Sequence, residues 1–189
     1  MEVARPLPEA LALLDLHPVT GRPLPTVSPA LRSSGAVLLE LVLQGRIAVG
    51  GNVTVLRREA MKVESLDEVL GELVVSPVAS TLEWIRRLST DAHANALRRL
   101  PHGAAALTER AELVEKLRGV LFDKRIAGPR MLMTLGLVSA VRMEAVIFGA
   151  DHVRARARER DLLSHLPPEA PPTLALAGVA LALQTLLWS

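Results

Sequence analysis

Apolar residues recur at helical spacing along almost the whole chain, and this pattern constrains the fold more than any other feature. Spacings of three and four residues place such side chains on one face of a helix. The pattern predicts a short helix over 9–16, then a helix capped by Ser28 that has Pro29 at its first position and ends at Gly45. Further helices are expected near 104–121, 130–148 and 151–165.

One segment departs from the helical pattern. The β-prone runs RIAV and VTVLRR flank Gly-Gly-Asn at 50–52, which predicts a β-hairpin. Ser65 with Glu68, and Ser80 with Glu83, have the spacing of helix capping boxes, and we expect a loop over 89–97. The chain should therefore be mainly α, a single-domain helical bundle over residues 1–189 with one or more β-hairpins.

The composition excludes several classes of protein. The 189 residues are 50% hydrophobic but only 2% aromatic, and they include no cysteine. A disulfide scaffold, a cysteine metal site and a cysteine nucleophile are impossible, and an aromatic platform for single-stranded nucleic acid is excluded. The helix that precedes the predicted hairpin lacks the polar face that base recognition requires, so no nucleic-acid partner is expected.

No catalytic or cofactor motif stands out. The five histidines are scattered without metal-ligand spacing, and no phosphate-binding glycine loop is present. Glu40 is the one charge in an apolar helix, which suggests a catalytic acid or, as we favour, a structural residue with Arg46 as its partner. We therefore expect no enzyme activity, no metal and no cofactor.

The segment from Ala170 to Ser189 carries no charge. Its length is close to that of a membrane span, but Pro171 and Pro172 shorten the helical part. We favour a helix buried in the fold. Because the N-terminal sequence also lacks the pattern of a secretory signal, a cytoplasmic protein is expected.

Arginine outnumbers lysine 19 to 3. The run RARARERD places Arg154 with Arg158 and Arg156 with Arg160 at i,i+4 spacing, and Arg57-Arg58, Arg86-Arg87 and Arg98-Arg99 form doublets. Such runs are usually solvated helix faces. The functional alternative is contact with an anionic surface.

Five segments, in order, resemble the Golgi phosphoprotein 3 family. SSGAVLLELVLQGRIAV is similar to the helix-to-hairpin signature of that family. The others are LDEVLGEL, STLEWIRRLS, ERAELVEKLRGVL and GPRMLMTLGLVSAVRMEAVI. The resemblance implies a mainly helical, non-enzymatic peripheral membrane adaptor that binds phosphatidylinositol 4-phosphate and grasps the cytosolic tails of membrane proteins.

The chain departs from the family at the lipid site. The positions of the family's lipid-binding Trp and three Arg fall on Pro25, Ser34, Ala105 and Thr108. The hairpin that should follow Leu121 looks deleted, which together with the composition suggests a shortened, bacterial member. Five arginines near the lost positions are candidates for a less selective lipid-headgroup or anion site: Arg22, Arg32, Arg98, Arg99 and Arg110.

Two hypotheses follow from the resemblance and the departures. The first is a cytoplasmic adaptor that associates peripherally and weakly with anionic membrane surfaces. The alternative is a protein-interaction or scaffold module without lipid binding, for which protein tails are the expected partners.

Overall fold

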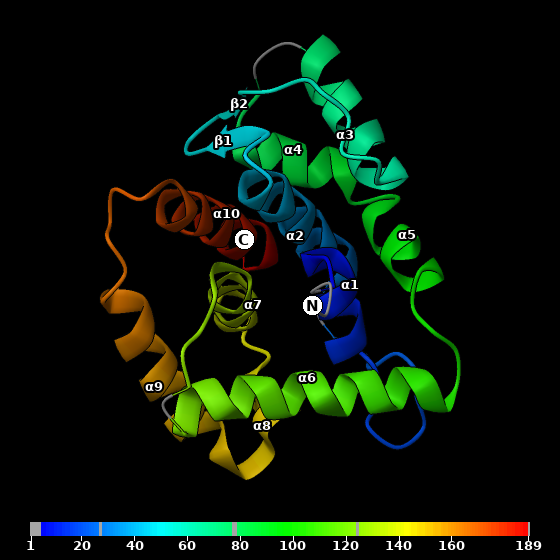
Figure 1. The fold of residues 1–189 in the computed structure, drawn as a ribbon, viewed down its shortest axis with the longest axis vertical. Helices are drawn as coiled ribbons and strands as arrows, with labels where there is room; N and C mark the ends of the chain where they lie inside the picture. The colour runs from blue at the N-terminus through cyan, green and yellow to red at the C-terminus, as the bar shows by residue number, and fades with distance from the viewer. Residues whose placement is uncertain (1–4, 27, 77–78, 124, 189) are drawn as a thin grey trace.

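Helix α2 (Pro29–Leu43) lies at the centre of a mainly α-helical fold (Figure 1). The computed structural model describes residues 5–26, 28–76, 79–123 and 125–188. Every residue of α2 from Arg32 to Val42 is buried. A helix that is apolar on nearly every side must be covered on nearly every side. Five helices pack around it: α1 (Leu7–Leu14), α4 (Thr81–Leu88), α5 (Ala92–Arg98), α7 (Pro129–Ala140) and α10 (Pro171–Trp188).

The elements follow one another with short connections. In chain order after α1 (Leu7–Leu14) and α2, they are β1 (Ile47–Val49), β2 (Val53–Val55), α3 (Glu64–Val75), α4 (Thr81–Leu88), α5 (Ala92–Arg98), α6 (Ala104–Phe122), α7 (Pro129–Ala140), α8 (Glu144–Phe148), a 3₁₀ turn (Gly149–Asp151), α9 (His152–Ser164) and α10 (Pro171–Trp188). Helix α6 crosses the lower edge of the view in Figure 1, far from α3 at the upper edge.

The predicted hairpin is confirmed. Strands β1 and β2 pair antiparallel, with Ile47 opposite Val55 and Val49 opposite Val53. The turn is held from outside the hairpin, because Thr81 Oγ1 donates to the carbonyl of Gly50 at 2.9 Å. On the other side Gly178 of α10 approaches so closely that a Cβ there would lie 2.8 Å from the Gly50 oxygen.

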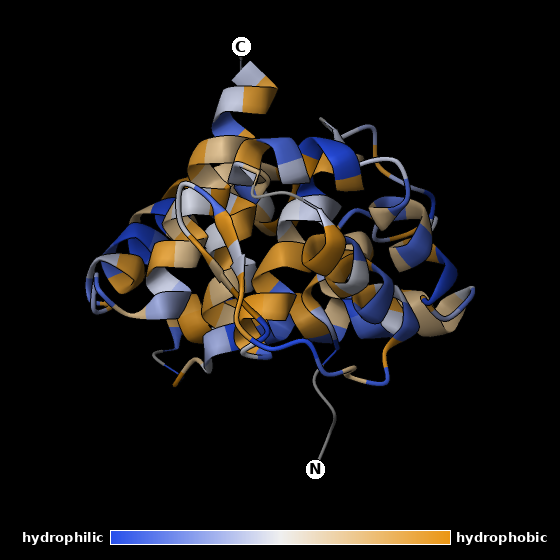
Figure 2. Ribbon diagram, turned by 90° about the horizontal axis from the view of Figure 1, so that it is seen from above, coloured by the Kyte–Doolittle hydropathy of each residue, from blue (hydrophilic) through white to orange (hydrophobic). Residues whose placement is uncertain are grey.

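Helix α10 is buried on one face only. Its inner face packs on α2, α7, α4 and β1 through Ala175, Leu176, Val179, Ala182 and Leu183. Its outer face leaves Leu174, Leu181 and Trp188 exposed. By length and composition alone it is the one described helix that is both long and apolar enough to cross a membrane, and 28% of its residues are buried. Its C-terminal end projects from the body of the molecule (Figure 2).

Several local predictions need correction. The expected helix over 130–148 is broken into α7 and α8, because Arg142 takes a left-handed conformation with φ of 56°. The expected loop over 89–97 contains helix α5. The Ser80–Glu83 capping box is confirmed. At Ser65, however, the capping box is not formed: the helix begins two residues earlier than predicted, at Glu64, and Asp67 accepts the backbone N–H groups of Met61 and Val63.

Helix starts and ends elsewhere shift by a few residues. The first helix runs over Leu7–Leu14 rather than 9–16. Ser28 occupies the expected N-cap position before Pro29, but its φ is 43° and its side chain makes no capping hydrogen bond.

Candidate functional site

Glu40 connects, through hydrogen bonds, segments that are distant in the sequence. Its carboxylate is 1% exposed and accepts the backbone N–H of Leu7 at 2.9 Å. It also pairs with the guanidinium of Arg130 and accepts from Gln44 Nε2 at 3.0 Å. The prediction that Arg46 is the partner of Glu40 is wrong, because Arg46 pairs with Glu59 at 3.0 Å. All of these contacts are internal to the protein, so this buried acid anchors α1 and α7 to α2.

Arg32 belongs to a second buried cluster rather than to a surface site. Arg32 Nη2 donates to Asp15 Oδ1 at 2.5 Å and to Thr26 Oγ1 at 2.6 Å. Burial raises the pKa of Asp15, and the charge of Arg32 opposes that rise. Beside this pair the Ser33 hydroxyl lies 3.1 Å from His93 Nδ1, and desolvation lowers the pKa of His93. Arg32 is 1% exposed, so the prediction that it meets an anion at the surface fails.

The other four candidate arginines lie in different settings. Arg110 is buried within α6, and desolvation lowers its pKa. Arg22 is exposed in the loop between α1 and α2, and the Arg98 guanidinium bonds the side chain of Asn95. Only Arg99 lines one of the cavities described below. Two of the five predicted residues are therefore unavailable to an outside ligand.

The region where the resemblance predicts a lipid site contains a hollow whose described lining includes no arginine or lysine. A cavity of about 500 Å³ lies between the α1–α2 loop and the start of α6, and His102 is its one ionisable lining residue. The positions predicted to correspond to the family's lipid-binding residues carry no charge: Pro25 is exposed, Ser34 Oγ donates to the Ala30 carbonyl, and Thr108 Oγ1 donates to the Ala104 carbonyl. Ala105 is exposed at the first turn of α6.

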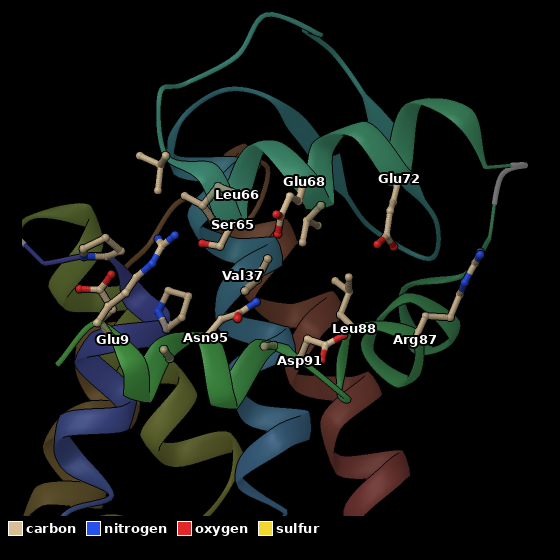
Figure 3. Close-up of a pocket in the computed structure, with 17 residues that line it drawn as sticks. Glu9, Val37, Ser65, Leu66, Glu68, Glu72, Arg87, Leu88, Asp91 and Asn95 are labelled. Carbon is tan, nitrogen blue, oxygen red and sulfur yellow. The ribbon is translucent and has the colours of Figure 1, made fainter.

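An acidic cleft of about 100 Å³ lies between α3 and α5, with walls from α1, α2 and α4 (Figure 3). The side chains of Glu68 and Glu72 point from α3 toward Asp91 at the start of α5. Among the described residues these three carboxylates make no hydrogen bond or ion pair, whereas Glu9 pairs with Arg5. Arg87 closes one end and stacks over Trp84 at 4.8 Å.

A basic hollow of about 650 Å³ lies between α7, α8 and α9. Its cations are Arg142, Arg156 and Arg160. Arg156 forms a two-pronged pair with the buried Glu144, at 2.8 and 3.2 Å. Burial, together with the neighbouring charge of Glu144, raises the pKa of Glu159 to about 8, so this carboxyl is largely neutral at pH 7.

The hollow continues to the end of α10, because Arg142 stacks over the exposed ring of Trp188 at 4.9 Å. Sequence reasoning identified the Arg156–Arg160 spacing but missed Arg142 and Trp188. Arg142 follows an apolar run with no turn residue to mark it, and Trp188 meets it only through tertiary packing. Within the described ranges no group of three His, Asp or Glu side chains has the geometry to hold a metal.

Comparison with protein families identifies the chain's relatives. The family described as Golgi phosphoprotein 3 (GPP34) matches residues 7–186, which is nearly the whole chain. It is not a known enzyme family. No curated protein matches the chain.

Proposed function

The chain belongs to the Golgi phosphoprotein 3 family, and we propose that it is a non-enzymatic, cytoplasmic adaptor that associates peripherally with anionic membrane surfaces. The observation that carries this proposal is the outer face of α10. Leu174, Leu181 and Trp188 are 51%, 67% and 53% exposed on a helix that contains no charged residue. An uncharged helix that exposes leucine and tryptophan beside arginines has the chemistry of an interfacial anchor.

The basic hollow supplies the electrostatic half of this contact. Arg142 touches Trp188, so the cations of the hollow lie at the same end of the molecule as the exposed ring. Each basic side chain held near an anionic surface contributes about 1 kcal/mol, and full burial of a leucine side chain contributes about 1.5–3 kcal/mol. Because only the exposed parts of three apolar side chains are available, the sum supports weak, reversible binding.

This surface differs from the family's lipid site. The cavity between the α1–α2 loop and the start of α6 has no arginine among its lining residues, which supports the prediction that the headgroup-binding cations of the family are missing there. The short connection between α6 and α7 has no room for a membrane-dipping hairpin. That short connection, with the excess of arginine and the lack of cysteine, supports the further proposal of a shortened, bacterial member.

Vesicle co-sedimentation tests the membrane proposal. Wild-type protein should sediment with vesicles that contain phosphatidylglycerol, sediment less in high salt, and stay in solution with pure phosphatidylcholine. Leu181→Glu should abolish sedimentation. The matched control is Val75→Glu, a change at another exposed apolar residue, which should sediment like the wild type. Sedimentation of Leu181→Glu at the wild-type level would overturn the role of α10.

The acidic cleft supports a second candidate, a protein-interaction module that needs no lipid. Glu68, Glu72 and Asp91 present carboxylates toward one opening without an ion pair to any described residue, which suits an Arg- or Lys-rich protein tail. Fluorescence anisotropy with a labelled arginine-rich peptide tests this candidate. Glu68→Gln with Glu72→Gln should weaken binding, whereas Glu169→Gln, in the exposed linker before α10, should not. Equal binding by both variants would exclude the cleft.

A further inference from the structure

Two cavities of opposite character meet beside α9. The basic hollow and an apolar groove of about 280 Å³ between α7, α9 and α10 share Ser139 and Leu163 as lining residues. One continuous depression thus has a cationic end and an apolar end. Small-ligand sites in proteins are typically clefts of about 300–1,000 Å³, and the joined depression, which is open to solvent along its length, falls within that range.

The cationic end carries an excess of positive charge. Glu144 is neutralised by the two-pronged pair with Arg156. In the part of the chain that the structure describes, Arg142 makes a ring contact with Trp188, and Arg160 makes no ion pair. A guanidinium group binds two phosphate oxygens at once. The hollow therefore suits a phosphate group.

The apolar end is shaped by small side chains. Gly136 and Ala140 of α7 line the groove together with Ala177 and Ala180 of α10. Leucines from α9, the following linker and α10 complete the walls at Leu163, Leu166 and Leu176. Leu176 fills the space beside Gly136, so the open part of the groove lies beside Ala140, Ala177 and Ala180, and the leucines make it unfavourable for water. A hydrocarbon chain is the complement of such a groove.

We propose that hollow and groove form one binding site for a single anionic phospholipid, with its phosphate on Arg142, Arg156 and Arg160 and an acyl chain between α7, α9 and α10. This site deepens the proposed membrane association and rests on it for the source of the ligand. The charge of the hollow selects a phosphate that is not masked by choline. Occupation would also hold the protein on the membrane beside the exposed face of α10.

Isothermal titration with soluble short-chain lipids tests the site without a membrane surface. Dihexanoyl phosphatidic acid, below its micelle concentration, should bind with a stoichiometry of one and at least tenfold more tightly than inorganic phosphate or dihexanoyl phosphatidylcholine. Equal affinity for phosphate and phosphatidic acid would overturn the role of the groove. Equal affinity for the two lipids would overturn the role of the arginines.

Two variants separate the ends of the site. Arg160→Gln should weaken phosphatidic acid binding about fivefold, which corresponds to about 1 kcal/mol for one cation. Ala177→Trp should fill the groove and reduce the affinity to that of inorganic phosphate. The charge control is Arg57→Gln on the hairpin, and the bulk control is Ala157→Trp on the exposed side of α9. Both controls should bind as the wild type does.

The vesicle experiment and the soluble-lipid titration can contradict the two proposals separately. Sedimentation with anionic vesicles, without binding of soluble phosphatidic acid, would overturn the site and leave the membrane proposal standing. Loss of both would overturn both proposals. Thermal unfolding of Ala177→Trp and Arg160→Gln must match the wild type, and Arg142→Gln serves as a second test of the cationic end if either variant unfolds early.

Discussion

Replacing Glu40 by glutamine should destabilise the fold by about 2–3 kcal/mol. The carboxylate is 1% exposed and accepts from the Leu7 backbone, from Gln44 and from Arg130. Glutamine keeps the shape and one acceptor oxygen, but it removes the charge and points a donor group at other donors. A hydrogen bond to a charged group contributes about 1.5–3 kcal/mol, and loss of a buried ion-pair partner costs about 3–5 kcal/mol.

The expected cost lies below the roughly 3–5 kcal/mol of a fully buried ion pair because Arg130 is partly accessible to water. Its side chain is 29% exposed, so solvent partly replaces the lost carboxylate for the arginine. The Leu7 N–H lies in buried surroundings at the first position of α1, where a helix has unsatisfied donors. The cost should therefore fall mainly on the docking of α1 against α2.

Urea unfolding measures the effect. Glu40→Gln should lower the midpoint without changing the slope, since the surface exposed on unfolding stays the same. A double-mutant cycle with Arg130→Gln should give a coupling of at least about 1 kcal/mol, because the two side chains share hydrogen bonds. Glu72→Gln, an exposed carboxylate of the acidic cleft, is the control and should shift the stability by no more than about 0.5 kcal/mol.

A Glu40→Gln protein as stable as the wild type would refute this reasoning. So would a coupling to Arg130 near zero, because the pair would then make no joint contribution to stability. Either result would return Glu40 to the group of candidate functional carboxylates, since a buried acid without a structural role requires another explanation.

Three further changes have definite expected outcomes. Glu159→Gln should raise the melting temperature more at pH 8 than at pH 5. The pKa of Glu159 in the folded state, about 8, lies above its value in the unfolded state, so the stability of the wild type falls as the pH rises between these two values. Glu144 stays paired to Arg156 over this range. Gly178→Ala should cost about 1–3 kcal/mol in urea unfolding despite alanine's higher helix propensity, because its Cβ would lie 2.8 Å from a backbone oxygen. Ser80→Ala should cost about 1 kcal/mol by the same measurement, since it removes the hydroxyl that accepts the Glu83 N–H.

Local signals predicted the elements well where the physical cause is local. The hairpin follows from Gly-Gly-Asn between two β-prone runs, and the start of α4 follows from Ser80 and Glu83. The break between α7 and α8 could not be predicted in this way. Apolar residues continue across it, and Arg142 takes a positive φ that sequence patterns associate with glycine or asparagine.

The partners of the buried charges depend on tertiary packing. Glu40 is 90 residues from Arg130, and Arg32 is 17 residues from Asp15. A search near Glu40 in sequence finds Arg46, which turns away to Glu59 at the base of the hairpin. The same limitation explains why Arg32 was included among candidate surface cations, since only the fold shows the carboxylate that occupies it.

The most ambiguous segment in the sequence, the charge-free C-terminal helix, has a consistent physical interpretation in the structure. If α10 crossed a membrane, its inner face would separate from the rest of the fold. Leu176, which packs so closely on Gly136 that a Cβ there would lie 2.4 Å from it, would lose this contact. Helices α2 and α7 would then expose apolar surface that α10 now covers. Lying flat on a membrane avoids this cost, because Leu174, Leu181 and Trp188 point away from the fold. A helix with one packed face and one bare apolar face can serve the core and the bilayer together, and this is the physical reason to expect peripheral rather than transmembrane association.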